Sequence, residues 1–133
     1  MRLVVDTSVV IAVITGEPTR DALIRTTRGT DLLAPPSLHW ELGNALAAQL
    51  RRDRLNLEQA RHLVRAYQRI PIQLADVPLD SALEISAEQG IYAYDAYVIA
   101  CARRYRCPLL TLDRGLERAA AAAGADVIEV EQS

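Results

Sequence analysis

The amino-acid sequence predicts an α/β fold with three layers (α/β/α), in which helices flank a parallel sheet of four to five strands. Short apolar runs rich in Leu and Val alternate along the chain with longer amphipathic segments, an order that is typical of parallel sheets. The short runs are apolar at successive positions, which indicates strands buried on both faces. The length of 133 residues suits one domain, residues 1–133, with a single core.

Strands are expected where a short apolar run ends at an acid, a proline or a turn. The first run is followed directly by Asp6, the second ends at Pro35, and Pro108 precedes the fourth. The third run is the weakest of the set. The predicted strands are 3–5, 31–34, 72–74 and 109–112, with 127–128 as a last short strand.

Helices are expected between these strands, where apolar residues recur every three to four positions. Ser37 is predicted to be an N-cap, because a serine hydroxyl accepts a hydrogen bond from a free amide of the first turn. Gly29, Gly90 and Gly124 mark helix ends. The predicted helices are 7–15, 18–28, 37–52, 57–69, 79–88, a segment through 95–102, and 114–123.

The composition is that of an ordinary globular protein, with 50% hydrophobic and 24% charged residues. No apolar run approaches the roughly 20 residues that cross a bilayer. The first apolar run meets Asp6 at once, unlike the long apolar stretch of a secretory leader. We therefore expect a cytoplasmic protein. Cys101 and Cys107 lack the C-x-x-C spacing of a zinc site, so they are predicted to be reduced, buried thiols.

The chain contains no lysine, because all 15 basic residues are arginine. Every mechanism that needs a lysine is therefore excluded. The formal net charge of −2 gives no overall sign of nucleic-acid binding. Arginines cluster at 51–54 and at 103–106. Their guanidinium groups suit phosphate oxygens, although the preference of helix C-termini for cations explains both clusters equally well.

Three aspartates stand out by their positions. Asp6 and Asp113 follow predicted parallel strands, whose carboxyl ends form the ligand crevice of open α/β sheets. Helix capping explains each of them equally well. Asp95 shares one helical face with Val98 and Ile99, and an acid that faces a core without a partner costs several kcal/mol. Asp95 is thus the acid that is hardest to explain as structure.

A fourth acid, Glu41, shares a helical face with Asn44, three residues on. Four acids converging on one crevice would repel one another unless a cation lay between them. Carboxylate oxygens suit Mg²⁺ or Mn²⁺, and such an ion activates water and neutralises charge on a phosphate. The hydroxyl of Ser8 is a candidate for contacting the metal or substrate, and capping the next helix is the alternative.

The acids lie within longer motifs that carry a family resemblance. The sequence resembles the PIN-domain family, and specifically its VapC-type toxins of bacterial toxin–antitoxin pairs. The resemblance spans nearly the whole chain in the family's order. The matching motifs are Leu3-Val4-Val5-Asp6-Thr7-Ser8, Trp40-Glu41-Leu42-Gly43-Asn44-Ala45-Leu46, Tyr94-Asp95-Ala96-Tyr97 and Pro108-Leu109-Leu110-Thr111-Leu112-Asp113.

The resemblance implies a divalent-metal endoribonuclease, usually a homodimer, which a small antitoxin neutralises in a heterotetramer or larger complex. Asp6, Glu41 and Asp95 match the family's invariant acids, and Asp113 matches the more variable fourth. The metal ligands are expected to be Asp6, Asp95 and Asp113. Ser8 and Thr111 match the family's hydroxyl positions, and Asn44 is expected to have a supporting role.

Other proteins with a similar sheet are less compatible with these residues. Receiver domains need a lysine, and aspartyl-phosphate phosphatases usually have a second aspartate where this chain has Ser8. A dinucleotide or P-loop site would show glycines after the first strand, and they are absent. Two alternatives to the toxin stay open: a housekeeping PIN ribonuclease in RNA processing, and a catalytically inactive PIN binding module.

Overall fold

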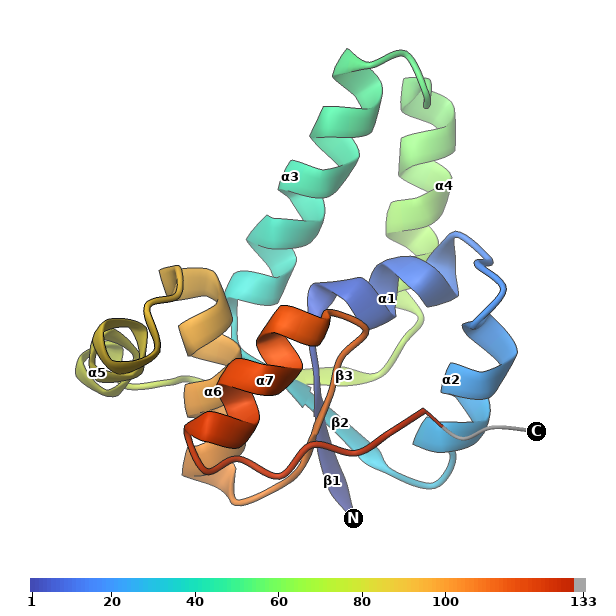
Figure 1. The fold of residues 1–133 in the computed structure, drawn as a ribbon. Helices are drawn as coiled ribbons and strands as arrows, with labels where there is room; N and C mark the ends of the chain where they lie inside the picture. The colour runs from blue at the N-terminus through green and yellow to red at the C-terminus, as the bar shows by residue number, and fades with distance from the viewer. Residues whose placement is uncertain (131–133) are drawn as a thin grey trace.

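A four-stranded parallel sheet lies at the centre of the molecule (Figure 1). The structure, a computed structural model, describes residues 1–130. The strands lie in the order β3-β2-β1-β4, and every pair is parallel. Their bounds are β1 Arg2–Val5, β2 Asp31–Ala34, β3 Ile72–Leu74 and β4 Leu109–Leu110. The predicted parallel α/β/α architecture is therefore confirmed.

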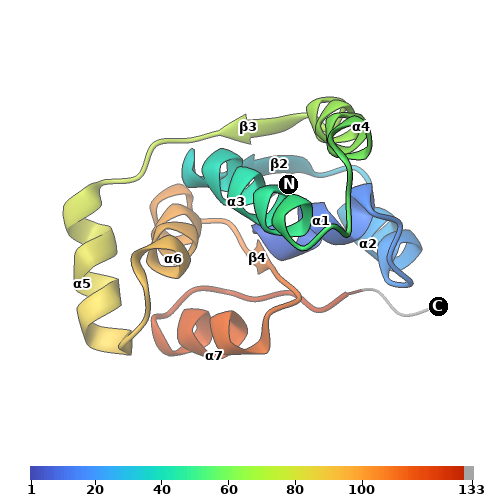
Figure 2. The same ribbon diagram turned by 90° about the horizontal axis from the view of Figure 1, so that it is seen from above.

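Seven helices surround the sheet within the described residues. Helices α1, α2 and α3 pack on one apolar core, and α5, α6 and α7 pack on a second. Figure 2 shows α5, α6 and α7 gathered on one side of the molecule. The bounds are α1 Thr7–Ile14, α2 Arg20–Thr27, α3 Ser37–Arg51, α4 Leu57–Gln68, α5 Leu79–Gln89, α6 Ala93–Tyr105 and α7 Arg114–Ala122. None of these helices is long and apolar enough to span a membrane.

Strand β1 is the central element of both cores. Leu3 and Val5 belong to the core beneath α1, α2 and α3, whereas Val4 belongs to the opposite core. All three side chains are at most 1% exposed, as expected for a strand covered on both faces. From β1 the chain runs outward through β2 and β3 and then returns to β4 on the other side of β1. This reversal of direction between β1 and β4 is the position at which open α/β sheets bind ligands.

Strand β4 ends two residues earlier than the predicted strand 109–112. β4 stops at Leu110, because Thr111 leaves the ladder and its hydroxyl accepts a hydrogen bond from the Asp113 amide (3.0 Å). The predicted last strand, 127–128, is reduced to a single parallel bridge between Val127 and Leu109. The helices agree with the predicted ranges to within a few residues.

The two cysteines are free and buried, as predicted. Burial raises the pKa of the Cys101 thiol to about 12 and also raises that of Cys107. Both thiols therefore stay protonated at neutral pH and behave as small apolar side chains.

The predicted N-cap of α3 is wrong. Pro36 occupies the cap position, and Ser37 is the first helical residue, with no side-chain cap hydrogen bond. The Ser37 hydroxyl oxygen is buried and has no hydrogen-bond partner within residues 1–130. The two prolines before Ser37 explain the difference, because proline is favoured where the first free amides of a helix would otherwise lie.

Replacing Ser37 by alanine should therefore leave stability unchanged or raise it by up to about 1 kcal/mol. The change removes an unsatisfied buried hydroxyl and introduces a better helix former. Chemical denaturation of both proteins measures the difference. Asn56→Ala is the matched control, because Asn56 caps α4 through a complete capping box with Gln59. That variant should lose about 1 kcal/mol. A similar loss of stability in Ser37→Ala would show that Ser37 does cap α3.

Candidate active site

The carboxylate of Asp6 lies buried directly after β1, with 6% of the residue exposed. As the N-cap of α1 it accepts a hydrogen bond from the Val9 amide (3.3 Å) on Oδ1. The Ser8 hydroxyl donates to the same oxygen at 2.6 Å, and the Thr111 hydroxyl donates to Oδ2 at 2.5 Å. Both carboxylate oxygens are thus held in fixed directions by donors from two separate parts of the chain.

The two hydroxyls also join the start of α1 to the loop after β4. The Leu112 amide donates to the Ser8 oxygen at 3.0 Å, and the Asp113 amide donates to the Thr111 oxygen at 3.0 Å. The hydroxyl of Ser8 is therefore engaged with Asp6 and with this loop, while Asp6 is the residue that caps α1. The alternative in which Ser8 caps the helix is not observed.

Glu41 projects from α3 and is half-buried. The Thr7 hydroxyl donates to its Oε2 at 2.6 Å. We assigned no role to Thr7 from the sequence, although a hydroxyl residue directly after Asp6 is a recognisable signal. Asn44, one turn further along α3, is exposed, and its side chain makes no hydrogen bond within the described chain.

Asp95 lies in the first turn of α6 and is half-buried. Val98 and Ile99, on the same helical face, are buried, as the sequence pattern predicts. Asp113 is exposed and caps α7 by accepting a hydrogen bond from the Leu116 amide (3.1 Å) on Oδ1. Asp6 and Asp113 are therefore both helix caps, whereas Glu41 and Asp95 lie within their helices.

Three of the acids have raised pKa values. Burial is the main cause for Asp6, and its hydrogen bonds from Ser8, Thr111 and Val9 oppose the rise in pKa. Burial also raises the pKa of Glu41, which the Thr7 hydrogen bond lowers and the charges of Asp6 and Asp95 raise further. The pKa of Asp95 rises through burial and the charge of Asp113. Asp113 in turn repels Asp6.

The four acids therefore form one electrostatically coupled group, which we call the acid group (Asp6, Glu41, Asp95 and Asp113). Its hard oxygen donors suit Mg²⁺ or Mn²⁺. Within residues 1–130, however, no group of three or more Asp, Glu, His or Cys side chains is close enough together to hold a metal ion by itself. A full protein cage is not required, because Mg²⁺ keeps several waters and is usually bound through one or two carboxylates.

The raised pKa of Asp95 means that its charge destabilises the folded state. The folded protein binds the proton more tightly than the unfolded chain, so stability falls as pH rises from the ordinary pKa of 3.8 through the folded-state value. In EDTA at neutral pH, Asp95→Asn should therefore melt a few degrees above the wild type. The difference should vanish once the pH falls below about 4.

Asp80→Asn provides the control for this prediction. Asp80 is an exposed acid in the first turn of α5, so the effect of the helix dipole on its charge matches that on Asp95. It should show no gain at neutral pH. Thermal melts of the three proteins across this pH range test the idea. An Asp95→Asn protein that melts at or below the wild-type temperature at neutral pH would contradict it.

Comparison with known proteins identifies the family and the fold of this chain. No curated protein has a significant sequence match to the chain. Among solved structures, PAE2754 from Pyrobaculum aerophilum has a TM-score of 0.72 and 27% identity, with 96% of this chain and 92% of that chain covered. VapBC2 from Rickettsia felis, bound to a DNA fragment from its promoter, has a TM-score of 0.74 and 12% identity, with 98% and 100% covered.

A third similar structure is VapC20 from Mycobacterium tuberculosis, described as a sarcin-ricin loop cleaving toxin. Its TM-score is 0.66 at 16% identity, with 98% of this chain and 99% of that chain covered. The likeness to the two Vap proteins shows a shared fold. The model of the PIN domain family matches residues 3–122, a range that contains the whole acid group. The chain therefore belongs to the PIN domain family.

Proposed function

We propose that the protein is a divalent-metal-dependent endoribonuclease that hydrolyses RNA phosphodiester bonds. The observation that carries the proposal is the coupled acid group at the carboxyl edge of the sheet, in a chain that belongs to the PIN domain family. We take residues 1–133 to be a single PIN domain that acts in the cytoplasm. Membership of the PIN domain family supports a nuclease, and we further propose that its substrate is RNA.

Asp6, Asp95 and Asp113 are the residues that would hold Mg²⁺ or Mn²⁺, and the bound ion would activate a water molecule and neutralise charge on the scissile phosphate. Ser8 and Thr111 are positioning residues, because their hydroxyls fix both oxygens of Asp6. Asp113 uses Oδ1 to cap α7, which leaves its Oδ2 available. A supporting role for the exposed Asn44 remains part of the proposal.

Glu41 is the residue best suited to take a proton from the attacking water. Its raised pKa makes it a stronger base than an ordinary glutamate. Thr7 holds Oε2, so Oε1 is the oxygen that would receive the proton. Thr7 is thus a positioning residue for Glu41.

Within this activity, we propose the toxin of a type II toxin–antitoxin pair. Similarity in fold to VapBC2 and to the VapC20 toxin supports this assignment. The expected partners are RNA, a small cognate antitoxin and a second copy of this chain, in a heterotetramer or larger complex. A negatively charged acid group favours a basic antitoxin side chain. A housekeeping PIN ribonuclease is the second candidate, and an inactive PIN binding module is the third.

Asp95→Asn should lower the rate of RNA cleavage by at least about a hundredfold, while the protein stays folded. The change keeps the side-chain volume and removes a charge that would hold the cation. Brief induction of each protein, followed by sequencing of newly formed RNA ends across the whole transcriptome, measures cleavage of any RNA target. Asp80→Asn should cleave like the wild type. Unchanged cleavage by a folded Asp95→Asn protein would remove Asp95 from the site.

Metal binding provides a readout for the same variant that does not depend on activity. A cation that binds only the folded state stabilises it in proportion to RT ln(1 + [L]/Kd). Mg²⁺ or Mn²⁺ should raise the melting temperature of the wild type and of Asp80→Asn by more than matched ionic strength does. Asp95→Asn should gain little. Identical responses in all three proteins would show that Asp95 does not hold the cation.

The toxin assignment predicts a partner. Induction of the wild type alone should arrest growth, and co-expression with the product of a neighbouring short open reading frame should restore growth and yield a stable complex. Size-exclusion chromatography with light scattering measures the composition of that complex. If no neighbouring product binds or rescues growth, the housekeeping ribonuclease becomes the better assignment.

A further inference from the structure

A large cleft lies beside the acid group, between α2, the start of α7 and residues 129–130. Its volume is about 900 Å³. We call it the α2–α7 cleft, and Thr111, Leu112 and Arg114 form its edge nearest to Asp113. Thr111 also donates its hydrogen bond to the Asp6 carboxylate, so the cleft and the acid group share this residue.

Three arginines line this cleft: Arg25 from α2, and Arg114 and Arg118 from α7. Arg114 and Arg118 are one helical turn apart, so they share a face of α7. None of the three forms an ion pair within residues 1–130. The cleft therefore has three permanent cations that contact no counter-charge within residues 1–130.

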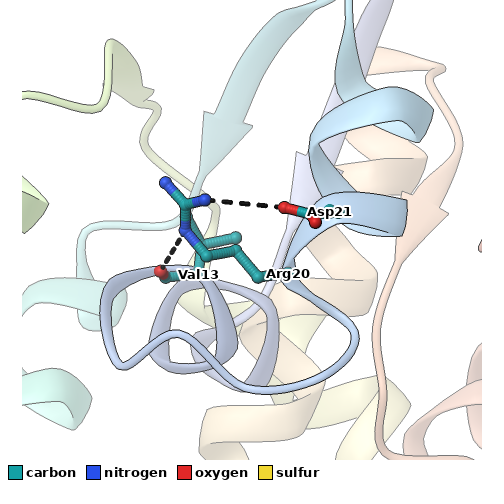
Figure 3. A network of polar contacts seen from close by, with 3 residues as sticks. All are labelled: Val13, Arg20 and Asp21. Atoms are coloured by element: carbon teal, nitrogen blue, oxygen red, sulfur yellow. Dashed lines mark hydrogen bonds and ion pairs between the residues drawn. The ribbon is translucent and has the colours of Figure 1, made fainter.

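Arg25 is the most unusual of these side chains. It is partly buried, and its Nε is fully buried without a hydrogen-bond partner in the described chain. Arg20, at the other end of α2, is the contrast (Figure 3): its Nε donates to the Val13 carbonyl at 3.1 Å and its Nη1 lies 3.6 Å from Asp21. A partly buried guanidinium with no partner is costly, so an anion at the part of Arg25 that faces the cleft would compensate it.

Carboxylates also line the cleft, so an anion would be favoured only close to the arginines and not throughout the cleft. Asp21, Glu117 and Glu129 line it together with the arginines, so its formal charge is balanced. Asp21 is paired with Arg20 and is largely exposed, and it forms no ion pair with Arg25 within residues 1–130. A compact dianionic or monoanionic group with several oxygens matches the guanidinium of Arg25 better than a diffuse polyanion does.

We propose that the α2–α7 cleft binds a backbone phosphate of the RNA strand next to the bond that is cleaved, with Arg25 as its main ligand and Arg114 and Arg118 in support. This proposal rests on the proposed function. A strand whose scissile phosphate lies at the acid group has further phosphates on either side, and the cleft that shares Thr111 is placed to receive one of them. An acidic protein segment is the alternative ligand, but the position of the cleft next to the acid group, with Thr111 shared between them, favours the substrate.

The test measures binding of a labelled single-stranded RNA oligonucleotide of mixed sequence in EDTA, where cleavage is blocked, as a function of salt. Backbone contacts do not depend on sequence. Arg25→Gln should weaken binding roughly tenfold, and the slope of log K against log salt should become shallower by about 0.7 for one lost phosphate contact. Arg114→Gln should shift both quantities in the same direction, and its exposed side chain makes its fold insensitive to the change.

Arg28→Gln is the matched control, because Arg28 is an exposed arginine at the end of the same helix and does not line the cleft. It should bind like the wild type. Equal affinity and slope in Arg25→Gln, Arg114→Gln and Arg28→Gln would overturn the proposal, even if the wild type cleaves RNA. Displacement of the RNA by a polyglutamate peptide as effectively as by unlabelled RNA would also overturn it, in favour of an acidic protein segment.

The phosphate site and the nuclease activity can fail independently of each other in these experiments. Wild type that binds RNA through Arg25 and Arg114 but cleaves none with Mg²⁺ or Mn²⁺ would support the phosphate site and contradict the nuclease. Wild type that cleaves RNA, with no effect of either arginine on the salt slope, would support the nuclease and contradict the phosphate site.

Discussion

Burial of the Asp6 carboxylate is the constraint on which much of the remaining structure depends. A buried carboxylate is costly unless it is hydrogen-bonded, and here its donors are Val9, Ser8 and Thr111. To supply its donor, Thr111 leaves strand β4, and its oxygen in turn accepts from the Asp113 amide. The direction of α1, the short length of β4 and the start of α7 are therefore coupled through one side chain.

The four acids of the acid group also repel one another. These acids come from the ends or first turns of α1, α6 and α7 and from the side of α3, so only the complete fold brings them within electrostatic range. Their mutual repulsion adds to the effect of burial in raising the pKa values of Asp6, Glu41 and Asp95. Stability is thus lowered at the place where a cation would be most favourable, which is a common relation between active sites and folding.

The positive charges of the protein differ from the acids in one physical respect. All 15 strongly basic side chains are arginines, which remain protonated at every pH at which a protein folds. Any dependence of the acid group on pH therefore arises from its carboxylates. The arrangement separates two kinds of charge: the carboxylates of the acid group, three of which have raised pKa values, and permanent cations in the α2–α7 cleft beside them.

The parallel sheet and the approximate bounds of the helices could be predicted from the sequence alone, and the sequence also singled out the four acids that the fold brings into electrostatic range. These features depend on local patterns, such as an acid directly after an apolar run for Asp6, or an acid on the apolar face of a helix for Asp95. Each pattern lies within a few residues, so it can be recognised without knowing what packs against it.

Only the tertiary structure decided how these residues are held and what surrounds them. The hydrogen bond from Thr7 to Glu41 joins residues 34 positions apart, and that from Thr111 to Asp6 joins residues 105 positions apart. The buried hydroxyl of Ser37, which replaced the predicted cap, likewise follows from how α3 packs after its prolines. The placement of Arg25 beside α7 is another such feature, together with the burial of its Nε without a partner in residues 1–130. Such contacts are set by the packing of distant segments, and no local pattern encodes the distance between them.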